Sequence, residues 1–166
     1  MPPRAFRVLP YGRPLTLYSP PMSVRRKTIL VVDAGEEARE ALAAPLRREY
    51  RVLRAAAGGP AAEILMKEEV DLLITDVDLP DMSGAELLQL SRVNFPLTEV
   101  ILTSARADVD QAVDAIKLGA FHFLARPVSP DALRTIVAHA EAHADRNRRL
   151  LRLEDQVGDQ APREFI

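Results

Sequence analysis

Five short apolar runs recur through the middle of this 166-residue chain, and a stretch with helical spacing follows each one. The runs cover residues 28–33, 50–55, 71–76, 99–103 and 120–125. The first and the third are nearly continuous in apolar residues, which is typical of parallel strands that are buried on both faces. The alternation predicts an α/β fold, in which helices cover both faces of a five-stranded parallel, doubly wound sheet.

The stretches between the runs predict the helices. We expect helices over residues 36–48, 60–68, 85–92 and 109–118, and a last one that opens at Pro130. Pro45 lies inside the first of these. A proline there removes a backbone hydrogen bond and costs about 3 kcal/mol, so we expect a kink or an interruption at this residue.

The two ends of the chain differ in composition from its middle. Six of the 13 prolines fall in the first 21 residues, so residues 1–26 are predicted to form a disordered, extended arm, and Met22 could be an alternative start. Residues 27–142 are predicted to form the folded domain, and residues 143–166 a C-terminal helix or linker.

Composition excludes several classes of function. There is no cysteine, which excludes disulfides, thiolate catalysis and cysteine-ligated zinc. A net charge of -2 provides no overall attraction for nucleic acid, so we expect no direct nucleic-acid contact. The apolar runs are far shorter than the roughly 20 residues of a membrane span, and no signal peptide opens the chain. A cytoplasmic protein without membrane contact is expected.

Polar residues stand where the predicted strands end. The first and third strands end at Asp33 and Asp76, the fourth at Thr103 and Ser104, and the fifth leads to Arg126. Ligands of such sheets bind at this edge. A carboxylate can accept a phosphoryl group, while a hydroxyl and a cation can bind the transferred oxygens, so the set points to phosphoryl chemistry.

Residues 27–142 resemble the receiver domain of bacterial two-component response regulators. The resemblance rests on the segments 71–84, with Asp76 before a proline and a glycine at family spacing, 100–105 and 119–127. It implies the flavodoxin-like receiver fold and a role in phosphorelay signal transduction. In that role Asp76 would accept a phosphoryl group from a sensor histidine kinase or a phosphotransfer protein, and the domain would not be an enzyme.

The resemblance also assigns roles to three further residues. Ser104 aligns with the family's switch hydroxyl and Phe123 with its rotating aromatic residue, so the two together would switch a protein-interaction face. Arg126 takes the place of the family's lysine. The peptide bond before Pro127 is expected to be cis.

One departure concerns the metal. The family normally ends its first strand with two adjacent acids, the second of which binds magnesium, whereas Ala34 follows Asp33 here. The resemblance then implies Asp33, Asp76 and Asp78 as the ligands, with Asp78 contributing its backbone carbonyl. The Mg²⁺ site they form is expected to be weak, because Mg²⁺ demands a full set of oxygen ligands.

Two other readings remain open. Ala34, Gly35 and Arg126 favour a pseudo-receiver, which would bind a partner without being phosphorylated. The pair Asp76 and Asp78 is similar to the Asp-x-Asp signature of haloacid-dehalogenase-type phosphatases, although it lies on the third strand and no cap domain fits this length. Nucleotide binding is set aside, because no phosphate-binding glycine motif follows a strand.

The last helix carries two overlapping seams with heptad spacing, which predict a homodimer through this helix. The first runs through Ile136, Ala140, His143, Asn147, Leu150, Glu154 and Val157. The second runs through Leu133, Val137, Ala140, Ala144, Asn147 and Leu151. Both contain Asn147, which we expect to hydrogen-bond its counterpart in the second copy. The segment 150–166 also faintly resembles the linker before the ATPase module of receiver-containing transcriptional activators.

Overall fold

The computed structural model of the protein describes residues 26–106 and 108–160, with side chains to residue 155. The arm expected at residues 1–26 lies outside this part except for its last residue. Five parallel strands form one sheet in the order β2-β1-β3-β4-β5, so the predicted sheet is confirmed. The strands are β1 (Thr28–Val32), β2 (Arg51–Ala55), β3 (Leu72–Asp76), β4 (Glu99–Ser104) and β5 (His122–Ala125).

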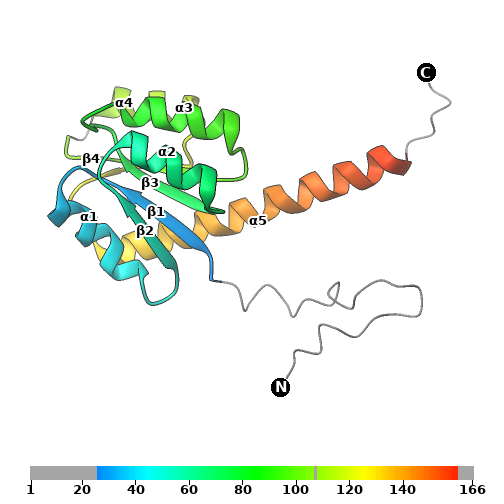
Figure 1. Cartoon of the computed structure of the whole chain (residues 1–166), viewed down its shortest axis with the longest axis horizontal. Helices are drawn as coiled ribbons and strands as arrows, with labels where there is room; N and C mark the ends of the chain where they lie inside the picture. The colour runs from blue at the N-terminus through cyan, green and yellow to red at the C-terminus, as the bar shows by residue number, and fades with distance from the viewer. Residues whose placement is uncertain (1–25, 107, 161–166) are drawn as a thin grey trace.

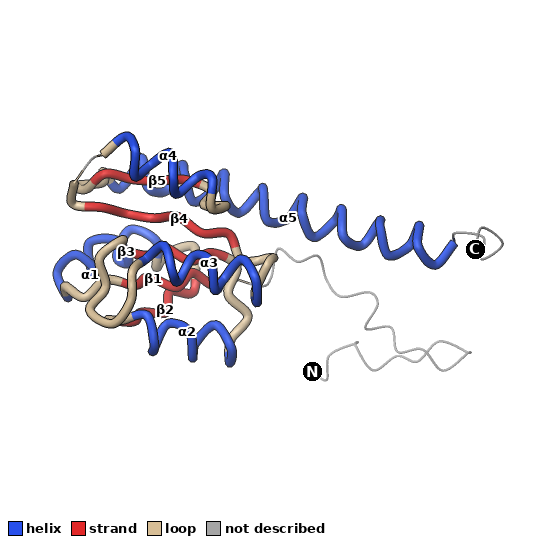
Figure 2. The backbone as a smooth tube through the Cα atoms, turned by 90° about the horizontal axis from the view of Figure 1, so that it is seen from above, coloured by secondary structure: helices blue, strands red, loops and turns tan. Residues whose placement is uncertain are grey.

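Five α-helices cover the two faces of the sheet. They are α1 (Glu36–Ala43), α2 (Gly58–Lys67), α3 (Gly84–Asn94), α4 (Val109–Lys117) and α5 (Pro130–Gln160). Helices α2, α3 and α4 lie on one face, and α1 and α5 on the other (Figures 1 and 2). Alternate residues of β1 feed the two cores: Leu30 and Val32 pack under α2, and Ile29 and Val31 pack under α1 and α5. This explains why the strand has no polar face.

Pro45 interrupts the first helix as expected, and the helix predicted to residue 48 is too long. Helix α1 ends at Ala43 and is followed by a single 3₁₀ turn, η4 (Ala44–Leu46), with Pro45 in its first positions. A proline is tolerated there because its missing N–H would have had no helical partner.

Helix α5 passes the boundary expected at residue 142 without a break and projects well beyond the sheet (Figure 1). Leu133, Val137, Ala140 and Ala144 of the second seam are each at most 1% exposed, because they pack on the helix's own sheet. The amide of Asn147 donates to Glu99 Oε1 of the same chain at 3.0 Å. The expectations that these four residues and Asn147 pair with a second copy are therefore wrong, whereas Leu151 of the same seam is 45% exposed.

Within the described residues, no helix combines the length and the apolar character that crossing a membrane requires.

Candidate phosphoacceptor site

Three of the residues predicted at the strand ends meet at the carboxyl edge of the sheet. Asp33 follows β1, Asp76 ends the central strand β3, and Arg126 follows β5. The guanidinium of Arg126 lies between the two acids. Its Nη1 donates to Asp33 Oδ2 at 2.7 Å, and its Nη2 is 3.3 Å from Asp76 Oδ1. The parallel sheet creates this cluster, because it places the carboxyl ends of all its strands on one edge.

The two carboxylates are buried, with Asp33 3% and Asp76 6% exposed. Burial raises the pKa of Asp76 above its ordinary value, while the charge of Arg126 and a hydrogen bond from the backbone of Asp78 oppose the rise. Asp76 Oδ1 has an ionic contact with Arg126 but no aligned hydrogen bond. One oxygen of the Asp76 carboxylate is therefore buried without an aligned hydrogen bond, which is uncommon for a buried polar atom.

Asp33 is held more firmly than Asp76, by contacts that the sequence did not indicate. The backbone N–H of Gly35 donates to Asp33 Oδ1 at 2.8 Å. Arg39, on the first turns of α1, donates from Nη1 to the backbone carbonyl of Asp33 at 2.8 Å. No motif could have identified Arg39, because a backbone carbonyl is an acceptor at every position.

The loop after Asp76 is fixed by a close backbone approach. A Cβ atom on Gly84 would lie 2.3 Å from the carbonyl oxygen of Asp76, so only glycine fits where α3 begins. In the same loop, Asp81 accepts hydrogen bonds from the backbone N–H groups of Gly58 and Gly59 at the start of α2. These bonds lower the pKa of Asp81. The loop is thus tied to two helices and keeps Asp76 in place.

Of the other predicted site residues, Ser104 and Phe123 lie apart from the cluster, and Asp78 contacts Asp76 through its backbone. Ser104 is 2% exposed at the end of β4, where its hydroxyl donates to the carbonyl of Arg106 at 2.8 Å. Phe123 is partly buried against the core beneath α4. Asp78 is exposed. The peptide bond between Arg126 and Pro127 is cis, as expected.

The donors at this edge do not fit Mg²⁺. In the described part of the chain, no three His, Asp or Glu side chains lie close enough together to hold one metal ion. The side chains of Asp33, Asp76 and Asp78 therefore do not form a three-carboxylate cluster, and the ligand expected from Asp78, its backbone carbonyl, stays a prediction. Ala34 contributes no oxygen from its side chain, and a guanidinium already contacts both buried acids.

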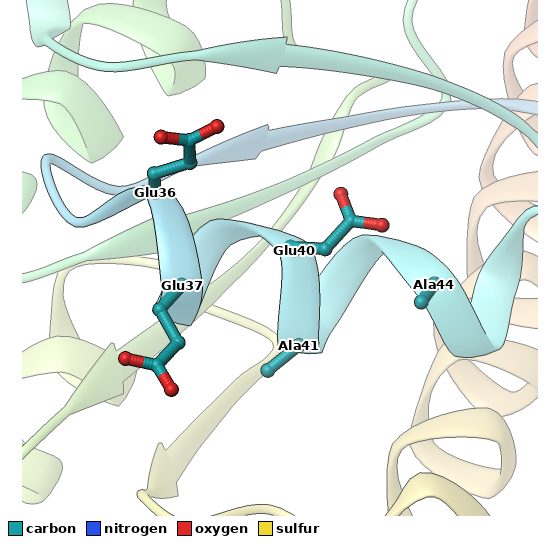
Figure 3. Close-up of a pocket in the computed structure, with 5 residues that line it drawn as sticks. All are labelled: Glu36, Glu37, Glu40, Ala41 and Ala44. Atoms are coloured by element: carbon teal, nitrogen blue, oxygen red, sulfur yellow. The ribbon is translucent and has the colours of Figure 1, made fainter.

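Two hollows lie near the cluster. One, of about 440 Å³, lies beside Arg126 and is lined otherwise by apolar residues of α1 and the loops after β4 and β5: Ala38, Ala41, Leu42, Ala105, Pro127 and Val128. The other lies along α1 beside Glu36, Glu37 and Glu40. Figure 3 shows the side chains of Glu36 and Glu37 pointing in opposite directions, and Glu40 is paired with Arg47 and Arg54. These carboxylates do not form a site.

Comparison with known proteins agrees with this geometry. Residues 29–138 match the family model described as the response regulator receiver domain. The chain is 37% identical over 138 residues to the response regulator protein PilR of Pseudomonas aeruginosa, covering 82% of this chain and 29% of that protein. A CheY-like receiver domain protein from Methanospirillum hungatei superposes with a TM-score of 0.70 at 27% identity, covering 74% of this chain and 99% of that one. The beryllofluoride-activated NtrC4 receiver domain dimer superposes with a TM-score of 0.68 at 30% identity, covering 70% and 98%.

The fold and the site thus define a phosphorelay signalling domain of the two-component type. The chain belongs to the response regulator receiver domain family. Receiver domains accept a phosphoryl group on an aspartate, interact with histidine kinases, generally bind Mg²⁺ at the phosphorylation site and are generally not enzymes. The chain spans less than a third of the length of its curated relative PilR.

Proposed function

We propose that Asp76 is the phosphoacceptor of this domain and that the phosphoryl donor is a sensor histidine kinase or a phosphotransfer protein. The observation that carries the proposal is the position of Asp76. It is a buried carboxylate at the end of the central strand, with a raised pKa, an oxygen without a hydrogen bond and a guanidinium 3.3 Å away. Perturbed carboxylates of this kind cluster at functional sites.

The transfer needs little covalent chemistry from the protein. A carboxylate oxygen of Asp76 forms a bond to phosphorus while the P–N bond of the donor's phosphohistidine breaks, and the electron pair stays on the imidazole nitrogen, which takes up a proton. Arg126 is placed to bind the oxygens of the transferred group. The remaining work is positioning, which the fixed loop between Asp76 and Gly84 supplies.

Intact-protein mass spectrometry after incubation with acetyl phosphate tests the proposal. We expect one added phosphoryl group on the wild-type chain and none on Asp76→Asn. Asp131→Asn is the matched control, because its side chain is 97% exposed at the start of α5, and it should be labelled like the wild type. Labelling that persists in Asp76→Asn would move the acceptor to another residue.

Two alternatives predict different results in the same assay. A pseudo-receiver, which Ala34 and Arg126 favour, would remain unlabelled under every condition. A phosphatase using Asp76 and Asp78 would hydrolyse a generic phosphate ester. We expect no such turnover, because Asp76 ends the third strand of a receiver fold and Asp78, in the loop after it, has an exposed side chain.

We further propose that the chain works in the cytoplasm and makes no direct contact with nucleic acid. We also propose that phosphorylation acts through Ser104 and Phe123 on a protein-interaction face. The position of Ser104 supports the switch. It is buried at the carboxyl end of β4, next to the central strand, and its bond to the Arg106 carbonyl is one that a phosphoryl oxygen could replace.

Pairing of two chains is proposed only for the part of α5 that projects beyond the domain. Leu150, Leu151 and Leu153 are 57%, 45% and 55% exposed there, and the related NtrC4 receiver is described as a dimer. Light scattering at micromolar concentration should give a dimer for the wild type and a monomer for the double variant Leu150→Glu/Leu153→Glu. Val93→Glu, on the exposed side of α3, is the control and should remain dimeric. A monomeric wild type would contradict the proposal.

A further inference from the structure

One guanidinium serves two buried acids at the carboxyl edge. Arg126 Nη1 is 2.7 Å from Asp33 Oδ2, and Nη2 is 3.3 Å from Asp76 Oδ1. Asp33 follows β1 and Asp76 ends β3, so the rigid fork of Arg126 links the ends of these two strands. A lysine has only one nitrogen and could not present two donors at this fixed separation.

The bridge occupies the oxygens that a metal ion would need. Asp33 Oδ1 already accepts the N–H of Gly35, and Asp33 Oδ2 and Asp76 Oδ1 face the guanidinium. Ala34 offers no carboxylate to replace them. Mg²⁺ requires nearly octahedral oxygen coordination at about 2.0–2.1 Å, and a positive guanidinium at the same oxygens would repel it.

One N–H group of Arg126 has no hydrogen-bond partner among the described residues. Its Nε–H is buried and has no hydrogen-bond partner in the described part of the chain, although the Nη atoms are engaged. Buried donors are rarely left without a partner. A phosphoryl oxygen on Asp76 would supply one, because arginine binds phosphate through several N–H groups at once.

We propose that Arg126 takes the place of the divalent cation in this receiver, so that Asp76 is phosphorylated without a metal ion. The inference rests on the proposed function of Asp76 but concerns a different residue. The guanidinium offsets the negative charge of Asp33 and Asp76 in the free protein. During transfer it takes over the phosphoryl oxygens, the role that a metal ion would otherwise fill.

The test compares metal binding with metal dependence. Electron paramagnetic resonance of Mn²⁺, used alone as the probe, should detect no binding to the wild type at sub-millimolar concentration. The double variant Ala34→Asp/Arg126→Lys should bind Mn²⁺, because it gains a carboxylate and loses the bridge. Ala34→Asp alone, which keeps the guanidinium, should bind at least about tenfold more weakly than the double variant. Circular dichroism confirms that each variant is folded. If the double variant does not fold, Mn²⁺ binding is compared among the wild type, Ala34→Asp and Arg126→Lys, and this comparison decides whether Arg126 keeps the metal out.

Labelling with acetyl phosphate gives the second measurement. The wild-type rate should change less than about twofold between Mg²⁺ and EDTA, whereas the double variant should lose about tenfold or more in EDTA. Mn²⁺ binding to the wild type as tight as to the double variant, or wild-type labelling that EDTA abolishes, would overturn the inference. If no chain is labelled under any condition, the proposed function of Asp76 fails, and Mn²⁺ binding alone still decides the role of Arg126.

Discussion

Each of the two edges of the sheet buries a pair of acids, but the acids differ in how completely their oxygens are hydrogen-bonded. At the amino edge, Asp71 accepts from Arg148 Nη2 at 2.7 Å and from the backbone N–H of Thr28 at 2.8 Å. Glu99 Oε1 accepts from Asn147 at 3.0 Å and lies 2.9 Å from His143 Nδ1. At the carboxyl edge, Asp33 and Asp76 share one arginine, and Asp76 Oδ1 has no hydrogen bond.

The difference separates a structural role from a reactive one. A buried acid whose oxygens are all engaged stabilises one arrangement of the chain and has nothing left to offer a ligand. At the amino edge, Asp71 has a partner on each oxygen and Glu99 has two on Oε1, and these contacts hold residues 143–148 of α5 on the sheet. A buried acid that lacks partners costs stability but leaves an oxygen free to react. The same residue types therefore have opposite roles on the two edges.

The largest expected effect is at the amino edge. Arg148→Ala would leave Asp71 buried without its charged partner, and loss of one member of a buried ion pair costs about 3–5 kcal/mol. Urea unfolding at about pH 7 should reveal this loss in the free energy of unfolding. Arg149→Ala, at the exposed neighbouring position, should stay within about 0.5 kcal/mol of the wild type. Equal effects of the two variants would mean that the amino edge does not fasten α5.

A smaller effect of opposite sign is expected at the carboxyl edge. The pKa of Asp76 is raised above its ordinary value of 3.8, chiefly by burial, so the folded state holds this proton more tightly than the unfolded state does. The associated stability is present below the unfolded pKa and is lost as the pH rises through the folded pKa. Asp76→Asn should therefore raise the free energy of unfolding at neutral pH, because the buried side chain no longer has to carry a charge.

The pH dependence provides the control for this second prediction. The gain should disappear near pH 3, where Asp76 of the wild type is protonated in both states. Asp131→Asn should give no gain at either pH, because its side chain is exposed. A destabilised Asp76→Asn at neutral pH would show that Asp76 is a structural acid like Asp71.

The sequence predicted the sheet, the helix interruption at Pro45 and the meeting of Asp33, Asp76 and Arg126, because the strands and their ends follow from local pattern and the ends of parallel strands share one edge. It did not predict the amino edge. Asn147 and its apolar neighbours have the same heptad spacing whether they face a second helix or their own sheet, and only the contact with Glu99 decides between the two. The sequence also did not predict that Arg126 bridges Asp33 and Asp76, because a motif gives the type of a residue but not the atoms that its side chain contacts.

The smallest effect concerns a hydrogen bond at the amino edge, which the hydroxyl of Tyr50 donates to Glu141 Oε2 on α5 at 2.8 Å. Burial and this bond raise the pKa of Tyr50 above its ordinary value of 10.0. Tyr50→Phe removes one hydrogen bond to a carboxylate that is only partly buried, so the free energy of unfolding should fall by about 0.5–1 kcal/mol at neutral pH. Because the folded state keeps the phenolic proton, this contribution is present below pH 10 and is lost as the pH rises further. The stabilities of Tyr50→Phe and the wild type, measured by urea unfolding at rising pH, should therefore converge in alkali. A gap that stays constant with pH would mean that the contact contributes packing rather than a proton held in place, and α5 would then be fastened by Asp71 and Glu99 without help from Tyr50.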